Sequence, residues 1–179
     1  MSKVIGSEID TQLLGLLRDL NSAEISKHHW KNCLTRHYEA GLQEAYDQAV
    51  AKVAKIKSEI APLDDLYAQH KWSRFFIVTS SSGHIHNSMN CHSCNKGRSF
   101  TTFALMPSLS GSTTEAAVAR LGAALCSHCF PTAPAEHREQ IKISQRAAQA
   151  LLDTGNESEF DRVIADQQKR ALRKAEKVQ

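Results

Sequence analysis

The hydrophobic residues near the start of the chain recur at helical spacing. Five leucines fall between positions 13 and 20, and the polar pair Asn21 and Ser22 follows them. Leucines three and four residues apart share one face of a helix. The pattern therefore predicts a largely buried helix that begins at Asp10 or Thr11 and breaks at Asn21.

A longer hydrophobic pattern predicts a second helix over residues 23–60. In its later half the apolar residues are alternately four and three positions apart, which is the heptad seam of helices that pair along their length. The seam residues are Leu42, Tyr46, Ala49, Val53, Ile56 and Ile60. The seam needs a partner helix, in the same chain or in a second copy, so a homodimer through residues 42–60 is one prediction. Pro62 is expected to stop or kink this helix, and LDDLYAQH to add a short turn.

The spacing of hydrophobic residues is no longer helical in residues 71–131, where β-structure is predicted. RFFIVTS is rich in aromatic and β-branched side chains, and SSSG with HIHNSM follows it. These features predict a β-hairpin whose second strand carries His84 and His86 on one face and Ile85 on the other. SFTTFALM, residues 99–106, predicts a third strand.

Two further helical segments are expected after these strands. A capping box of Ser112 and Glu115 predicts a short helix that stops at Gly122. In residues 132–179, one helix is predicted to begin near Pro134 and to include Ile141 and Ile143, and it ends at DTGN. Asn156 and Glu159 predict the cap of a final helix, whose apolar stripe could lie on the heptad seam.

The predicted fold class is α+β, with helices from both termini packed together and a small β module inserted between them. The expected domains are an N-terminal helical region with the heptad seam over residues 1–70, the β module over residues 71–131, and C-terminal helices over residues 132–179 that pack on the N-terminal region.

The overall composition is that of a soluble globular protein, with 41% hydrophobic and 23% charged residues. Arg18 and Asp19 interrupt the apolar cluster LLGLLRDL, which is too short to span a membrane and lacks a signal-peptide cleavage pattern. We therefore expect a cytoplasmic protein without a membrane partner.

Four of the five cysteines form two C-x-x-C pairs. In a reducing compartment, pairs at this spacing indicate metal ligands more than disulfides. The pairs predict a tetrahedral Zn²⁺ site made by Cys91, Cys94, Cys126 and Cys129, and hence a zinc-ribbon-like β module. The alternative of two redox pairs lacks the βαβ context of a thioredoxin-like site. The fifth cysteine, Cys33, is expected to be a small buried residue.

The histidines near these pairs leave several roles open. His92 and His128 could each replace a cysteine as a ligand. His84 and His86 are candidates for a second metal or an acid–base pair, with Arg74 as anion clamp, but the sequence places no carboxylate between Asp65 and Glu115. The zinc-deaminase pattern also fails, because position 86 is His where that pattern needs Glu. The sequence therefore favours a packing or hydrogen-bonding role over an enzymatic one.

Charge is unevenly distributed, and the β module is poor in acidic residues. Residues 71–131 carry 5 Lys and Arg against 1 acidic residue. Such a surface tolerates phosphate or other anions, although a small zinc module also has few surface positions to fill. The candidate binding residues are Arg74, Lys96, Arg98 and Arg120.

The run from Trp72 to Pro131 also resembles a known group. The likeness lies in three successive segments, WSRFFIVTSSSGHIHNSMNCHSC, TTFALMPSLSG and LCSHCFPTAP. The run is similar to uncharacterised zinc-binding proteins of actinobacteria and actinobacteriophages. The likeness covers about a third of the chain. It implies zinc binding and a phage or mobile-element origin, with the host cytoplasm as the location, and it implies no activity.

Three functions remain open at this stage. The first is a zinc-stabilised binding or regulatory protein that contacts nucleic acid or a host protein. The second is a hydrolase or transferase that acts on a nucleotide or phosphate substrate through the His84 and His86 strand. The third is a coiled-coil assembly protein with a zinc cap.

Overall fold

The computed structural model describes residues 3–37, 39–94, 101–131, 142–154 and 157–176. The chain divides into two compact units, each of which is described by itself. One, here called the sheet unit, combines Met1–Asp10 with Trp72–Gln179, and the other, here called the helical hairpin, is Thr11–Lys71. The division differs from the three expected parts, because residues 72–131 and the residues after them belong to one unit.

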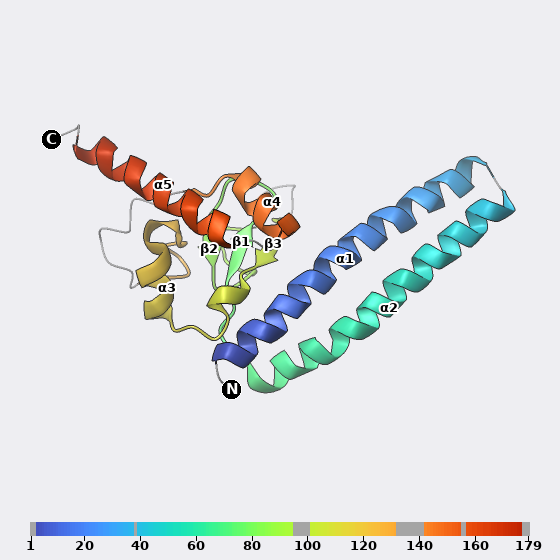
Figure 1. Ribbon diagram of the computed structural model, residues 1–179, viewed down its shortest axis with the longest axis horizontal. Helices are drawn as coiled ribbons and strands as arrows, with labels where there is room; N and C mark the ends of the chain where they lie inside the picture. The colour runs from blue at the N-terminus through green and yellow to red at the C-terminus, as the bar shows by residue number, and fades with distance from the viewer. Residues whose placement is uncertain (1–2, 38, 95–100, 132–141, 155–156, 177–179) are drawn as a thin grey trace. The chain divides into compact units, whose positions relative to one another are not determined.

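The helical hairpin is made of two long helices. Helix α1 spans Lys3–Arg36 and helix α2 spans Ala40–His70, and Figure 1 shows them side by side and antiparallel. Lys57 on α2 donates to the Glu24 carboxylate on α1 across 3.1 Å. The buried residues of α2 are Ala49, Val53, Ile56, Ile60 and Leu63, so most of the predicted seam is buried within one chain.

The expected boundaries of these helices were wrong. α1 continues through Asn21 and Ser22, which are exposed, and the chain turns only after Arg36. Exposed Asn and Ser in a helix cost only a few tenths of a kcal/mol, which tertiary burial of nearby residues such as Ala23 outweighs. Helix α2 likewise continues past Pro62 to His70, with residues buried on either side of the proline.

Three short strands form an antiparallel sheet in the order β2-β1-β3. Strand β1 is Phe76–Val78, β2 is Ile85–His86 and β3 is Phe103–Leu105. Phe76 pairs with His86 on one side of β1 and with Leu105 on the other. The predicted hairpin and third strand are therefore present in the described residues, and the α+β class is confirmed.

Helices cover this sheet and complete its core. They are the 3-10 helices η1 (Pro107–Leu109) and η2 (Gly122–Ala124), and α3 (Thr114–Leu121), α4 (Gln145–Thr154) and α5 (Glu157–Glu176). Leu151 of α4 and Phe160 and Ile164 of α5 share one buried cluster with Phe75 and Ile77. The described part of the C-terminal helices thus contributes to the core of the sheet unit.

Local details in this region differ from the expected pattern. Helix α3 is capped by Thr113, which accepts a hydrogen bond from Ala116 N–H, and not by Ser112, while Gly122 ends the helix as expected. Ile143 is not helical, since it forms an antiparallel bridge with Gly83. The expected helix start at Pro134 and the expected cap at Asn156 lie outside the described residues.

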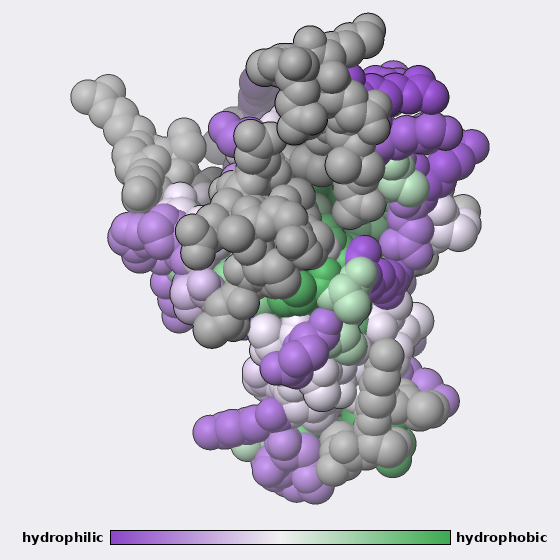
Figure 2. Space-filling model, turned by 90° about the vertical axis from the view of Figure 1, so that its left-hand side faces the viewer, coloured by the Kyte–Doolittle hydropathy of each residue, from purple (hydrophilic) through white to green (hydrophobic). Residues whose placement is uncertain are grey.

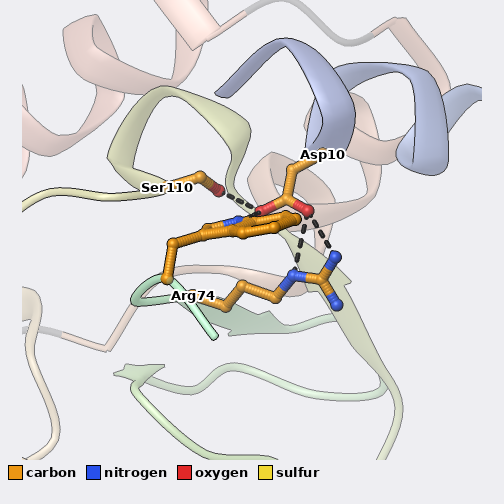
Figure 3. A network of polar contacts seen from close by, with 4 residues as sticks. Asp10, Arg74 and Ser110 are labelled. Atoms are coloured by element: carbon orange, nitrogen blue, oxygen red, sulfur yellow. Dashed lines mark hydrogen bonds and ion pairs between the residues drawn. The ribbon is translucent and has the colours of Figure 1, made fainter. Parts of the chain in front are cut away.

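A buried carboxylate joins the first turns of α1 to the rest of the sheet unit. Asp10 is fully buried, and Figure 3 shows it among its partners. Its Oδ2 accepts from Trp72 Nε1 at 2.8 Å and from Ser110 Oγ at 2.5 Å, and its Oδ1 pairs with Arg74 Nη2 at 2.6 Å. We call these four residues the Asp10 network. Gly6 leaves room for Trp72, because a Cβ there would lie 3.0 Å from the indole ring.

On the face in Figure 2, hydrophobic residues reach the surface in a limited central area, and hydrophilic residues surround them. Among the described helices, none combines the length and the hydropathy needed to cross a membrane.

Candidate metal centre

Two turns and one strand converge at the candidate centre. Ile85 forms a parallel bridge with Leu125, and Cys126 N–H donates to the Ile85 carbonyl at 2.9 Å. This bridge brings the second C-x-x-C turn beside His86 at the end of β2. Each turn is closed by a backbone bond, from Cys94 N–H to Cys91 O at 2.9 Å and from Cys129 N–H to Cys126 O at 3.1 Å.

Four side chains gather where these segments meet. His86, Cys91, Cys126 and Cys129 each offer one donor atom, and all four atoms lie within 4.8 Å of one another. We call this group the donor cluster. Cys91 Sγ is 3.9 Å from Cys126 Sγ, and Cys129 Sγ is 3.5 Å from His86 Nδ1. The donor cluster could hold a metal ion.

The donor cluster differs from the predicted ligand set at one position. Three of the four predicted cysteines belong to it, and His86 stands where Cys94 was expected. Cys94 is nearby, with its Sγ 3.5 Å from His86 Nε2. The sequence makes His86 a candidate for a second metal, an acid–base pair or a packing role, but not for the four-ligand zinc site. The Gly-His-x-His spacing alone does not indicate that His86 would be a ligand in place of a cysteine. His86 reaches the other donors through the bridge between Ile85 and Leu125, which are far apart in sequence.

Burial favours the neutral forms of two members. Desolvation, with smaller contributions from His84 and His128, lowers the pKa of His86 to about 4. Desolvation also raises the pKa of Cys129 to about 12. A neutral imidazole is the form that binds a metal, whereas a thiol must first lose its proton. A metal ion would therefore replace the Cys129 proton.

Ser93 supplies a hydroxyl beside the sulfurs. Its Oγ is 3.1 Å from Cys91 Sγ and 3.6 Å from Cys126 Sγ. Burial pushes the pKa of Cys91 upward, but hydrogen bonds from the Ser93 hydroxyl and backbone, together with those from Cys129 and Cys126, leave that pKa below its usual value. The hydroxyl is thus placed to stabilise thiolate charge.

The other two histidines of the C-x-x-C turns lie outside the donor cluster. His92 and His128 are exposed, and their rings contact edge to face with centroids 4.3 Å apart. Neither replaces a cysteine in the cluster.

His84 lies directly before β2 and, like His86, faces the side of the chain opposite Ile85, which is fully buried in the core. Both histidines line a cleft of about 300 Å³ beside the donor cluster. Burial and the nearby Lys142 ammonium lower the pKa of His84. The expected arrangement of this strand is therefore present, but none of the described residues lining the cleft is Asp or Glu.

The predicted binding residues are not gathered at the centre. Arg74 is buried and ion-paired with Asp10, with its guanidinium 5.1 Å from the Trp72 ring centre. Its burial and its pairing with the Asp10 carboxylate disfavour the predicted use as an anion clamp or surface contact. Arg120 donates to Ser108 and to both carboxylate oxygens of Asp161. Lys96 and Arg98 lie outside the described residues.

Comparisons with protein-family models, with curated proteins and with solved structures find no match to this chain. The resemblance to zinc-binding proteins of actinobacteria and their phages therefore stays a prediction, and the geometry of the donor cluster carries the functional argument.

Proposed function

We propose that the protein is a zinc-stabilised binding module whose metal is held by the donor cluster. The supporting observation is that one nitrogen and three sulfur donors lie within 4.8 Å of one another. Thiolate and imidazole donors favour zinc over magnesium or calcium, which prefer oxygen.

Two of the donor–donor distances agree with tetrahedral zinc. Zn–S bonds of about 2.3 Å and Zn–N bonds of about 2.0 Å separate two sulfurs by about 3.8 Å and a sulfur from a nitrogen by about 3.5 Å. Cys91 and Cys126 are 3.9 Å apart, and Cys129 is 3.5 Å from His86 Nδ1. Cys94 Sγ, near His86 Nε2, then becomes a partner that orients the imidazole.

The metal would have a structural role. Four protein ligands close a tetrahedral site and leave no position for a substrate. The ligands come from β2 and from two turns that are far apart in sequence, and the strands of this sheet have only two or three residues each. Short strands contribute little stability by themselves, so metal binding would supply part of the folding free energy.

Binding is favoured over catalysis as the function of this module. The enzymatic alternative uses Arg74 as its anion clamp, but Arg74 is buried and paired with Asp10, and the cleft lining holds no described carboxylate to work with the histidines. Nucleic-acid contacts through Arg74 and Arg120 are disfavoured by their internal ion pairs. We therefore propose that the module binds its partner through a surface of the sheet unit that does not depend on Arg74 or Arg120.

Metal analysis tests the proposal directly. The full chain, purified without added chelator, should contain one zinc per molecule. Exchange into Co²⁺ should give a thiolate-to-cobalt charge-transfer band and the visible bands of tetrahedral cobalt. Cys126→Ser should lose the metal, whereas Cys33→Ser, which alters a cysteine outside the donor cluster, should keep it. A wild-type protein that contains no zinc and gives no cobalt–thiolate band would refute the proposal.

A further inference from the structure

The cleft beside the donor cluster is lined mostly by polar side chains. Its volume of about 300 Å³ is at the lower end of the range for small-molecule sites. Ser81, Ser82 and Ser127 line it, together with His86 and Cys126 of the donor cluster. Hydroxyl groups with no carboxylate among the described lining residues favour an anionic ligand over a cationic one.

His84 and Lys142 are brought together in this cleft by backbone pairing. Gly83 and Ile143 exchange two hydrogen bonds, with N···O distances of 3.0 and 2.7 Å. One residue further along this antiparallel register, His84 lies opposite Lys142, so both side chains leave the backbone on the same side. Both line the cleft. Nothing in the local sequence predicts this pair, because the two residues are far apart in the chain.

The imidazole of His84 carries an unsatisfied polar atom. Its Nε2 is buried and has no hydrogen-bond partner among the described residues. Buried polar atoms without partners are rare in native proteins, and a bound water or ion is one of the explanations for such an atom. The Lys142 ammonium lines the same cleft, and a positive charge there makes an anion the complementary ligand.

We propose that the cleft binds one phosphate group of a small phosphate-bearing molecule, with Lys142 Nζ and the His84 imidazole as its main contacts. Hydroxyl groups of the serines in the lining complete the site. The inference rests on the proposed function, because the metal would fix His86 and Cys126 in the cleft wall.

A small ligand fits the site better than a nucleic-acid strand. Proteins that bind nucleic acid neutralise several phosphates along the strand with Lys and Arg. Lys142 is the one Lys or Arg among the described residues that line this cleft. One ammonium and one imidazole match a single phosphate group.

Calorimetric titration of the zinc-loaded full chain tests this inference, with inorganic phosphate, ribose 5-phosphate and a single-stranded oligonucleotide as probes. Saturable one-to-one binding of phosphate or of ribose 5-phosphate is expected. Tighter binding of one of the two probes shows whether the site prefers free phosphate or a sugar phosphate. Lys142→Met should weaken this binding about tenfold or more, because it removes a charge-assisted contact. Lys142→Arg should retain most of it.

Matched variants separate a local effect from a loss of net charge. Lys52→Met removes the same charge from the exposed surface of α2 and should leave phosphate binding unchanged. His84→Ala should weaken binding, whereas His84→Gln, which keeps a side-chain donor, should weaken it less. Equal affinities for Lys142→Met and Lys52→Met would overturn the assignment, as would an oligonucleotide that binds far more tightly than ribose 5-phosphate with steep salt dependence.

The zinc content of each sample keeps the two proposals apart. A chain without zinc refutes the proposed metal centre. A chain with one zinc that shows no saturable phosphate binding refutes only the phosphate site.

Discussion

At the scale of single residues, His86 and His84 differ in their surroundings although they face the same side of the chain. His86 lies among thiols, with Nδ1 3.5 Å from Cys129 Sγ and Nε2 3.5 Å from Cys94 Sγ. His84 instead has a buried Nε2 without a partner among the described residues. The first environment suits a metal ligand whose second nitrogen is hydrogen-bonded, and the second suits contact with a bound ligand.

Replacing Cys94 should affect zinc binding less than replacing Cys126. We expect Cys94→Ser to keep one zinc, with affinity lowered by no more than about 10- to 100-fold, because it changes a partner of the ligand His86. Cys126→Ser removes a ligand and should lose far more affinity. Competition with a chromophoric chelator measures both. Equal losses for the two variants would contradict the assigned ligand set.

Asp10 is the residue whose loss should destabilise the sheet unit most directly. Asp10→Ala leaves the buried Arg74 guanidinium without its carboxylate, and breaking a buried ion pair in this way costs about 3–5 kcal/mol. Urea denaturation of full chains should show this loss. Asp64→Ala, on the exposed surface of α2, is the matched control and should change stability little. A loss for Asp10→Ala that equals the control would show that the Asp10 network contributes nothing.

At the scale of elements, Gly83 connects the β-hairpin to the segment around Ile143. A Cβ on residue 83 would lie 2.7 Å from Val78 Cβ, which is closer than side chains tolerate. The glycine therefore allows the close approach of β1 and the chain leading into β2, and with it the position of both histidines.

Gly83→Ala should destabilise the protein by about 1–3 kcal/mol through overpacking against Val78. Val78→Ala combined with Gly83→Ala should recover the part of the loss that comes from the Val78 methyl groups, which a Cβ would meet at 3.0 and 3.1 Å, although the contact with Val78 Cβ stays. Thermal unfolding of the four proteins in this cycle measures the coupling. Gly15→Ala, where a Cβ meets nothing within 4 Å, should not destabilise the chain. Additive effects of the two changes would contradict the contact.

Local patterns predicted some elements well and others poorly. RFFIVTS followed by SSSG carried enough turn and strand chemistry to predict the pairing of β1 with β2. Asn21 and Pro62 led to wrong predictions of where the helices end, because burial of neighbouring residues outweighs the low helix propensity of these two residues. Three members of the donor cluster followed from cysteine spacing, but His86, Lys142 and the Asp10 network depend on long-range contacts that no local spacing specifies.

At the scale of the whole molecule, the two units should respond differently to metal removal. All members of the donor cluster lie in the sheet unit, whereas the helical hairpin contains none of them. The protein has two tryptophans, of which Trp72 is buried in the sheet unit and Trp30 is half-buried on α1. A Trp30→Phe variant therefore reports on the sheet unit through Trp72 alone.

Chelation of zinc from the Trp30→Phe protein should shift Trp72 emission to longer wavelength, because loss of the metal loosens the unit that buries this residue. Far-ultraviolet circular dichroism should retain most of its helical signal from α1 and α2. Restoring zinc should reverse the emission change. An unchanged Trp72 spectrum after complete removal of the metal would argue against a structural role for zinc.

The most direct test of the donor cluster is zinc K-edge X-ray absorption of the purified full chain. The structure predicts a four-coordinate shell of three sulfurs at about 2.3 Å and one imidazole nitrogen at about 2.0 Å. A shell of four sulfurs without an imidazole would place Cys94 in the shell instead of His86 and would contradict the assigned ligands. A shell of oxygen and nitrogen alone would contradict the zinc–thiolate centre itself.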